Sequence, residues 1–356
     1  MIERVSHAGY VEVDLSALAR NYQVISRQVS TAVAAVVKAD GYGLGAARVA
    51  ERLYQSGCRT FFVATLEEGV ALRQSLRQAD IFIFEGARAG KESVIIEHKL
   101  VPVLNTVEQV RRWLPLEQKA AIHVDTGMTR LGLDVSDFRA LMAEGIDKRH
   151  IVYLMTHLAC ADDAASKQND AQLNEFLSIR SSLPEALTSI SNSGGAFLGK
   201  AFAGDLVRAG IGLYGGNPLA IGASPVEVVA TLKARVLQIR TLDHPANVGY
   251  GATYSASAGN RLAVVGVGYA DGYPRQLSNR AHASVNGIHV PVVGRVSMDL
   301  TCLDVTSIAP TDLREGDYVE MFGRDVTIET LADICGTINY EILTGLSARL
   351  KRVYLD

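Results

Sequence analysis

Short apolar runs alternate with amphipathic stretches through the first 215 residues, and this alternation constrains the fold more than any other feature of the sequence. The amphipathic stretches carry apolar residues three and four positions apart, the spacing of one helix face. The runs are apolar throughout, as expected of strands buried on both faces. They span residues 33–37, 60–64, 80–84, 101–104, 120–124, 151–155, 188–190 and 206–213. Strand followed by helix, repeated eight times over about 200 residues, favours a (β/α)8 barrel over an open doubly wound sheet.

The pattern changes after residue 220, where apolar and polar residues alternate with the period of a strand. Asn286-Gly287 lies between β-rich flanks and predicts a hairpin with a type I′ turn. Further strands are expected at 299–305 and 317–322, and a short helix at 328–335. The sequence therefore predicts an α/β chain in which a TIM-type barrel, residues 12–220, precedes a mostly β domain, residues 221–356. Residues 1–11 are candidates to pack on this second domain.

Composition and charge exclude several classes of protein. With 48% hydrophobic residues, 21% charged residues and a net charge of −3, the chain has no basic stripe of the kind that binds nucleic acid. No apolar stretch approaches the roughly 18 residues needed to span a membrane, and the N-terminus has no apolar signal region. A cytoplasmic location is therefore expected. The four cysteines have no CxxC spacing, so neither a metal site nor a disulfide scaffold is predicted.

Polar residues gather where the predicted barrel strands end, which is where catalytic groups collect in such barrels. Lys38 ends the first run, and an amine held at the end of a buried strand can form a Schiff base. On its own, a lysine in this place is more often just the solvated end of a strand. The glycines at 41, 43 and 45 allow the backbone to approach a ligand closely. Ser193 follows the seventh run, and Gly210 and Ile211 belong to the eighth, in the region where such barrels commonly bind phosphate.

The segment Lys38-Ala-Asp-Gly-Tyr-Gly-Leu-Gly resembles the pyridoxal-phosphate attachment motif of the alanine racemase family. Other fragments resemble motifs of that family, occur in the family's order and cover essentially the whole chain. They are residues 124–132, 155–157, 192–193, 208–215, 249–254, 268–273, 293–299 and 339–341.

The resemblance implies a role for each matching residue. Lys38 and Tyr250 would be the catalytic pair, and the cofactor would be pyridoxal 5′-phosphate. The cofactor-binding residues implied are Lys38, Tyr42, His157, Ser193, Arg208, Gly210, Ile211 and Tyr340. The substrate-binding residues implied are Arg130, Met298 and Tyr269. Taken alone, His157 would be read as a core histidine and each tyrosine as a packing residue. Glu67 and Glu68 are interpreted as a solvated helix face.

Three positions depart from the family pattern. His123 lies seven residues before Arg130, where many members have a lysine that becomes carbamylated and steadies the arginine. A histidine cannot form that carbamate, so the support of Arg130 has to come from elsewhere. Leu44 replaces a usual histidine and Ala209 a usual proline, and both are interpreted as packing changes.

The function implied is that of an isomerase that interconverts L- and D-alanine by a two-base mechanism. It would supply D-alanine for cell-wall peptidoglycan or serve alanine catabolism. The resemblance also implies a homodimer with composite active sites, in which Lys38 of one chain meets Tyr250 and Met298 of the other. Three alternatives stay open: an amino acid racemase of broader specificity, a pyridoxal-phosphate decarboxylase of the same architecture, and a non-catalytic pyridoxal-phosphate-binding protein.

Overall fold

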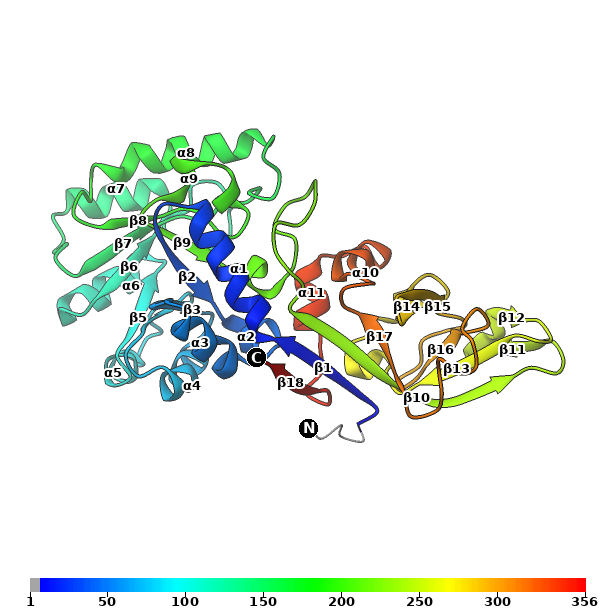
Figure 1. Ribbon diagram of the computed structural model, residues 1–356. Helices are drawn as coiled ribbons and strands as arrows, with labels where there is room; N and C mark the ends of the chain where they lie inside the picture. The colour runs from blue at the N-terminus through cyan, green and yellow to red at the C-terminus, as the bar shows by residue number, and fades with distance from the viewer. Residues whose placement is uncertain (1–6) are drawn as a thin grey trace. The chain divides into compact units, whose positions relative to one another are not determined.

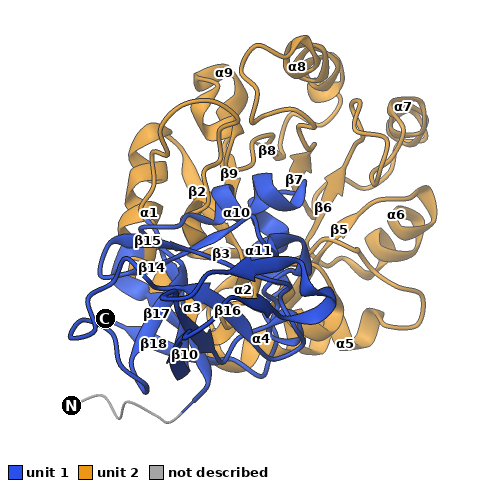
Figure 2. Ribbon diagram, turned by 90° about the vertical axis from the view of Figure 1, so that its right-hand side faces the viewer, with its two compact units in different colours: residues 1–17, 228–356 blue, residues 18–227 orange. Residues whose placement is uncertain are grey.

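The computed structural model describes residues 7–356, and its chain divides into two compact units (Figure 2). The barrel unit is Leu18–Glu227, and the β unit is Val228–Asp356 together with the N-terminal segment up to Ala17. The expectation for residues 1–11 falls partly on residues 1–6, which lie outside the described residues. Strand β1 (Gly9–Asp14) belongs to the β unit, because it pairs with β10 (Ala230–Thr241) and β18 (Lys351–Leu355).

Eight parallel strands form the barrel unit, in the order β8-β7-β6-β5-β4-β3-β2-β9. Their bounds are β2 Ala32–Val36, β3 Thr60–Val63, β4 Asp80–Ile83, β5 Leu100–Leu104, β6 Ala120–His123, β7 Ile151–Met155, β8 Leu187–Ser189 and β9 Leu206–Ala209. All eight predicted runs contain a strand, and the predicted (β/α)8 barrel is confirmed. Between β8 and β9 the ring is joined by single hydrogen bonds, from Asp205 N to Thr188 O (2.8 Å) and from Arg208 N to Ser191 O (3.0 Å). The last strand is shorter than predicted, because the chain turns at Gly210 into the 310 helix η3 (Ile211–Tyr214).

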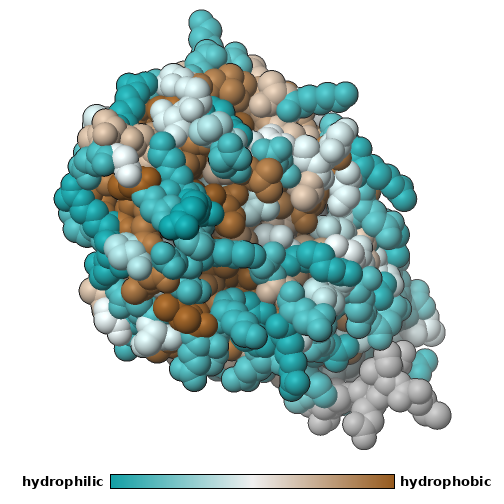
Figure 3. Space-filling model, turned by 90° about the vertical axis from the view of Figure 1, so that its left-hand side faces the viewer, coloured by the Kyte–Doolittle hydropathy of each residue, from teal (hydrophilic) through white to brown (hydrophobic). Residues whose placement is uncertain are grey.

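Helices surround these strands (Figure 1). They are α1 Leu15–Gln28, α3 Ala46–Gln55, α4 Leu66–Ser75, α5 Glu92–Glu97, α6 Val107–Trp113, α7 Val135–Ala143, α8 Lys167–Arg180 and α9 Lys200–Ala203, with the 310 helices η1 Leu114–Leu116 and η2 Gly195–Phe197. Thr65 and Thr106 start α4 and α6 by accepting a hydrogen bond from the third residue along. Inside the barrel the ring of Phe62 stacks on Phe82 and Phe84 at 4.8 and 5.0 Å. Figure 3 shows a face dominated by hydrophilic side chains, with apolar atoms between them.

The β unit is built on one sheet of eight strands and a two-stranded hairpin, β11–β12. Its remaining strands are β11 Ala246–Val248, β12 Tyr254–Ala256, β13 Arg261–Val265, β14 His282–Val285, β15 Ile288–Pro291, β16 Thr301–Asp304 and β17 Tyr318–Phe322. Asn286 and Gly287 join β14 to β15 with φ angles of 51° and 83°, which confirms the type I′ turn. The predicted helix is α10 (Ile328–Cys335), followed by α11 (Asn339–Thr344). Three 310 helices complete the unit: η4 Tyr250–Ala252, η5 Tyr269–Asp271 and η6 Arg275–Leu277.

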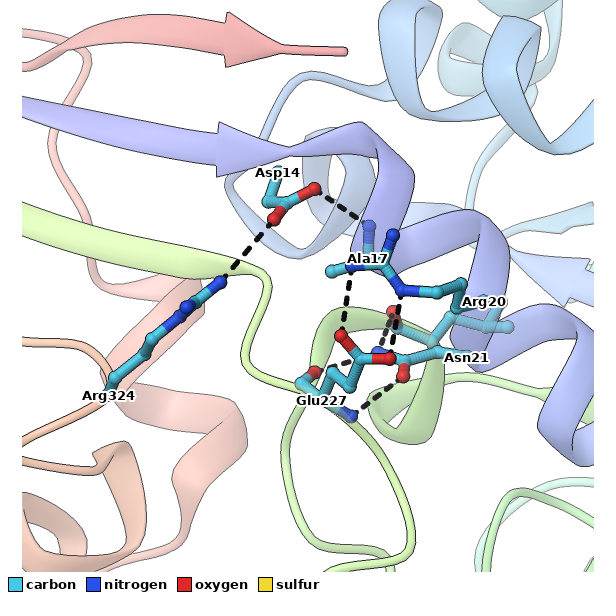
Figure 4. Close-up of polar contacts among 7 residues, drawn as sticks. Asp14, Ala17, Arg20, Asn21, Glu227 and Arg324 are labelled. Atoms are coloured by element: carbon cyan, nitrogen blue, oxygen red, sulfur yellow. Dashed lines mark hydrogen bonds and ion pairs between the residues drawn. The ribbon is translucent and has the colours of Figure 1, made fainter.

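Each unit has polar contacts of its own close to the points where the chain passes from one unit to the other (Figure 4). In the barrel unit, Asn21 exchanges hydrogen bonds of 2.8 Å with the backbone of Glu227. The Arg20 guanidinium grips the Glu227 carboxylate with two bonds of 2.9 Å. In the β unit, Asp14 accepts from Ala17 N at 2.7 Å and lies 3.8 Å from the Arg324 guanidinium.

Residues 7–356 contain no group of three or more His, Cys, Asp or Glu side chains arranged to hold a metal ion. Nor does any helix in that range have the length and apolar character needed to cross a membrane.

Candidate active site

Lys38 follows β2 at the carboxyl end of the barrel. The strand is buried along Val33 to Val36, so the side chain that comes just after it starts from a rigid support. Burial lowers the pKa of the Lys38 amine, and the nearby positive charge of Arg130 lowers it further, while Glu68 raises it. The amine also lies 5.7 Å from the centre of the Phe84 ring. These surroundings make Lys38 a better nucleophile and base near neutral pH than an ordinary lysine.

The backbone after Lys38 makes a left-handed turn. Ala39, Asp40 and Tyr42 have φ angles of 52°, 52° and 54°, and the glycines between and after them have similar values. For L-residues this conformation costs roughly 1–2 kcal/mol each, so a run of it needs support from its surroundings. The Asp40 carboxylate supplies part of that support by accepting from Ala46 N at 2.8 Å. Strain of this kind at the residue after Lys38 makes the segment a candidate for a functional role.

The turn brings Tyr42 back against the barrel. Its ring stacks on Tyr214 at 4.4 Å, and the Tyr214 hydroxyl donates to Val36 O at 2.9 Å. The Tyr42 hydroxyl occupies the place where a side chain at residue 210 would begin: a Cβ on Gly210 would lie 2.4 Å from it. Only glycine fits at position 210 beside this hydroxyl.

Ser193 lies at the same place, after β8. Its Oγ accepts hydrogen bonds from Gly210 N (2.8 Å) and Gly212 N (3.2 Å). Two hydroxyls and a set of backbone N–H groups therefore converge in one small region, as in the backbone concavities that bind phosphate. The predicted phosphate residues Tyr42, Ser193, Gly210 and Ile211 lie together, with Ile211 as the first residue of η3.

Arg208 on β9 is 2% exposed and donates in several directions. Its bonds go to Ser189 Oγ (2.6 Å), Thr156 O (2.7 Å) and His157 Nδ1 (3.1 Å). Its Nε is buried and has no acceptor among the described residues. An arginine can only donate, so His157 Nδ1 accepts and the proton of the neutral ring is on Nε2. Burial and the charge of Arg208 hold the pKa of His157 well below its usual value of 6.5.

A second histidine, His123, ends β6, and its protonation follows from its neighbour Asn105. Asn105 Nδ2 donates to Phe84 O (2.8 Å) and Val103 O (2.7 Å), so its Oδ1 faces His123 Nδ1 at 2.9 Å. The proton of His123 is therefore on Nδ1, and Nε2 is left as an acceptor. Burial and the charge of Arg208 lower the pKa of His123 to about 4. Sequence reasoning missed Asn105, although its place directly after β5 matches the pattern that revealed the other residues.

Arg130 is held through its backbone by the turn after β6. The Asp125 carboxylate accepts from the N–H groups of Gly127 (2.8 Å), Met128 (2.7 Å) and Arg130 (3.0 Å). Burial acts against the charged carboxylate, but these N–H groups outweigh it and lower the pKa of Asp125. The charge of Arg130 acts on Lys38, His123 and His157, so the arginine belongs to the same end of the barrel.

The other predicted site residues are in the β unit. Tyr250, Met298, Tyr269 and Tyr340 are 72%, 53%, 43% and 38% exposed. The loops that carry two of them are joined, because Tyr269 N donates to Ser297 O (3.0 Å) and Ala270 N to Met298 O (2.9 Å). Gly251, next to Tyr250, lies against the guanidinium of Arg295 in the neighbouring loop. Tyr250, Tyr269 and Met298 thus come from adjoining loops of this unit.

The interpretation of Glu68 as part of a solvated helix face is wrong. Its carboxylate accepts from Ala39 N and from Ala64 N, both at 2.7 Å. Glu67, its neighbour, is exposed, as expected, and it pairs with Arg88. The signal that identifies Glu68 is its spacing from Thr65, since Thr-x-x-Glu is the pattern of a helix start whose glutamate binds backbone N–H groups.

Comparison with known proteins agrees with this arrangement. Residues 13–218 match the model of the alanine racemase N-terminal domain, and residues 229–354 that of the C-terminal domain. Two proteins of Agrobacterium fabrum are similar over the whole chain. A catabolic alanine racemase is 43% identical, over 98% of this chain and 92% of its own length. A biosynthetic alanine racemase is 42% identical, over 96% and 93%.

The fold is also similar to a solved structure, that of an alanine racemase from Bartonella henselae with covalently bound pyridoxal phosphate. The two share 38% sequence identity and a TM-score of 0.91, over 98% of this chain and all of the other. The family resemblance predicted from the motifs is confirmed: this chain belongs to the alanine racemase family.

Proposed function

We propose that this protein is a pyridoxal-phosphate-dependent racemase that interconverts L- and D-alanine. The observation that carries the proposal is Lys38, an amine at the end of β2 whose pKa is lowered by burial and by Arg130. Tyr42, four residues further along, lies against Gly210, and the N–H of Gly210 donates to Ser193 Oγ. Membership of the alanine racemase family supports the reaction and the substrate.

The residues of the barrel unit fit the cofactor. Its phosphate would be held by Tyr42, Ser193 and the backbone at Gly210 and Ile211, and its aldehyde carbon would be bound by Lys38. The buried Nε of Arg208, which has no acceptor among the described residues, suits the ring nitrogen. When bound, pyridoxal phosphate supplies an electron sink for the charge left when the substrate Cα loses its proton.

The chain's own residues then have separate tasks. Arg130 binds the substrate carboxylate, for which a guanidinium is well suited. Lys38, whose amine would be freed when the substrate amine takes its place on the cofactor, would carry the proton on one face of the Cα and Tyr250 on the other, as racemisation needs an acid–base group on each side. Arg208 keeps its proton and would donate to the ring nitrogen, which would then stay unprotonated; the electron sink would be weaker, and return of the proton to Cα would be favoured.

We further propose a homodimer in which Tyr250 of the partner subunit completes the site around Lys38. The exposure of Tyr250 and Met298 in the single chain supports this arrangement. A catalytic tyrosine has to be shielded from bulk water, and a partner subunit would provide that shielding. Tyr269 and Tyr340 would lie near the same site, the first at the substrate and the second at the phosphate.

The proposed setting is the cytoplasm, with either supply of D-alanine for peptidoglycan or alanine catabolism as the role. The relatives named for the two roles have nearly the same sequence identity to this chain, 43% for the catabolic one and 42% for the biosynthetic one. Deletion of the gene separates the two: a requirement for D-alanine indicates the first, and loss of growth on alanine the second.

The decisive experiment offers the purified, cofactor-loaded protein a panel of single-enantiomer amino acids and follows the loss of optical rotation. Alanine should racemise fastest, whereas equal rates for larger or basic amino acids indicate a racemase of broader specificity. Release of carbon dioxide indicates a decarboxylase, and no reaction at all indicates a binding protein. After borohydride treatment, peptide mass analysis should find the pyridoxyl group on Lys38, and its presence on another lysine would refute the assignment.

A further inference from the structure

Glu68 joins the ends of two neighbouring barrel strands at the point where Lys38 leaves the sheet. Strands β2 and β3 are paired through Ala35 with Phe61 and Val36 with Phe62. Beyond the last pair, the Glu68 carboxylate links the two chain segments that leave the strands. Its Oε1 accepts from Ala39 N and its Oε2 from Ala64 N, both at 2.7 Å. Hydrogen bonds to a charged acceptor are stronger than those between neutral groups.

This contact differs from an ordinary helix start. In the Thr-x-x-Glu capping box, the glutamate binds the N–H of the threonine, here Thr65. The threonine half is present, since Thr65 Oγ1 accepts from Glu68 N at 3.3 Å. The glutamate half is diverted to Ala64 and, across to the next strand, to Ala39. A carboxylate that only began α4 would have no need to reach a residue 29 positions away.

The residue that it reaches is the first of the left-handed turn. Ala39 has a φ of 52° without the conformational freedom of glycine, so this backbone is strained, and the hydrogen bond to Glu68 helps to hold it. Within residues 7–356, the charged groups that act on Lys38 are Arg130 and Glu68, and Lys38 in turn acts on His157. Glu68 is the only negative charge among them.

We infer that Glu68 is a positioning residue for Lys38: its carboxylate fixes the backbone on which the lysine enters the cofactor site and balances the positive charge gathered there. Glu68 touches neither substrate nor cofactor in this account, and the inference rests on the proposed function of Lys38.

Three variants test it. Glu68→Gln keeps the size of the side chain, but its amide can accept from only one of the two N–H groups and carries no charge. Glu68→Asp keeps the charge but is too short to span both N–H groups. Glu67→Gln is the matched control, because it removes a charge from the adjacent, exposed position.

Two measurements that do not depend on turnover are made on each variant. One is the dissociation constant for pyridoxal phosphate, from absorbance titration of the apoprotein. The other is the pKa of the Lys38 amine in the apoprotein, from the pH dependence of its modification by trinitrobenzenesulfonate, read by peptide mass. Circular dichroism confirms that each variant is folded.

Glu68→Gln should raise the dissociation constant by about tenfold and lower the pKa of Lys38 by about one unit, since a balancing negative charge is lost. Glu68→Asp should weaken cofactor binding while leaving that pKa within about half a unit of wild type. If Glu68→Gln matches Glu67→Gln in both measurements, the inference is overturned. If Glu68→Gln does not fold, the test rests on Glu68→Asp, and cofactor binding by Glu68→Asp as tight as in the wild type would overturn the inference. Racemisation of alanine by the wild type tests the proposed function separately.

Discussion

At the scale of single residues, the site is defined by which groups can only donate and which can only accept. Arg208 is a buried donor, so both histidines near it are neutral, and they are opposite tautomers: His157 presents Nε2–H, and His123 presents a bare Nε2. A further positive charge beside Lys38, Arg130 and Arg208 would be costly at this depth. A histidine at position 123 cannot form a carbamate, so no carbamylated lysine supports Arg130 from that position.

Racemisation should therefore be independent of dissolved carbon dioxide. Rates measured in carbon-dioxide-free buffer and in bicarbonate should agree, because no lysine occupies position 123. His123→Lys is the control, since an amine there can take up carbon dioxide and should make the rate respond to bicarbonate. A carbamylated lysine found by mass beside Arg130 in the wild type would contradict this account.

The two neutral histidines also predict how stability depends on pH. The pKa of His123 is about 4 in the folded chain against about 6.5 unfolded, so the unfolded chain binds the proton first as pH falls. The free energy of unfolding should accordingly decrease from about pH 6.5 to pH 4, and His157 acts in the same direction. Urea midpoints at pH 7 and pH 5 measure the fall. Asn105→Asp places a carboxylate against His123, raises the pKa of His123 and should reduce the fall; an unchanged fall would show that His123 is not its source.

Tyr250→Phe tests the second acid–base group. Removing the hydroxyl should slow exchange of the alanine α-proton with solvent by about 10²- to 10⁴-fold while leaving cofactor affinity nearly unchanged. Exchange in D2O, followed by NMR, measures the first, and absorbance titration the second. Tyr254→Phe, a nearby tyrosine on β12, serves as the control and should behave as wild type. Normal exchange in Tyr250→Phe would end the two-base proposal.

At the scale of elements, barrel strands were predictable because a strand buried on both faces has to be apolar throughout, whatever it contacts. The residues at their ends were found for the same reason, as position along a barrel strand decides where a side chain goes. Glu68 and Asn105 were not found, since their roles depend on contacts with Ala39 and His123 that sequence spacing does not reveal. The left-handed turn was not predicted either, because only two of its five residues are glycine, the residue that usually signals a positive φ.

That turn should be sensitive to substitution of its glycines. Gly41 has a φ of 63°, and a Cβ there would lie 3.0 Å from the backbone of Ala46. Gly41→Ala should lower the free energy of unfolding by roughly 2 kcal/mol or more, from the left-handed conformation plus the crowding. Gly90→Ala is the control: its φ is 76° and its surroundings are open, so it should cost only about 1 kcal/mol. Urea unfolding measures both, and equal losses would show that the turn is not crowded.

At the scale of the whole molecule, the residues of the proposed site are divided between the two units of the chain. Lys38, Arg130, His157 and Arg208 belong to the barrel unit, whereas Tyr250, Met298 and Tyr340 belong to the β unit. The proposed homodimer would let each barrel unit use the β unit of its partner, and two-fold symmetry then gives two composite sites.

Mixing two inactive variants tests that arrangement. One chain carries Lys38→Ala and the other Tyr250→Phe, and subunits are exchanged under mild denaturant and verified by native mass spectrometry. In a shared-site dimer, one site of each mixed dimer receives both lesions and the other site is whole. Random exchange makes about half the dimers mixed, so about a quarter of wild-type activity should return. If Lys38 and Tyr250 of one site come from the same chain, every site keeps a lesion and no activity returns, because neither variant can then repair the other.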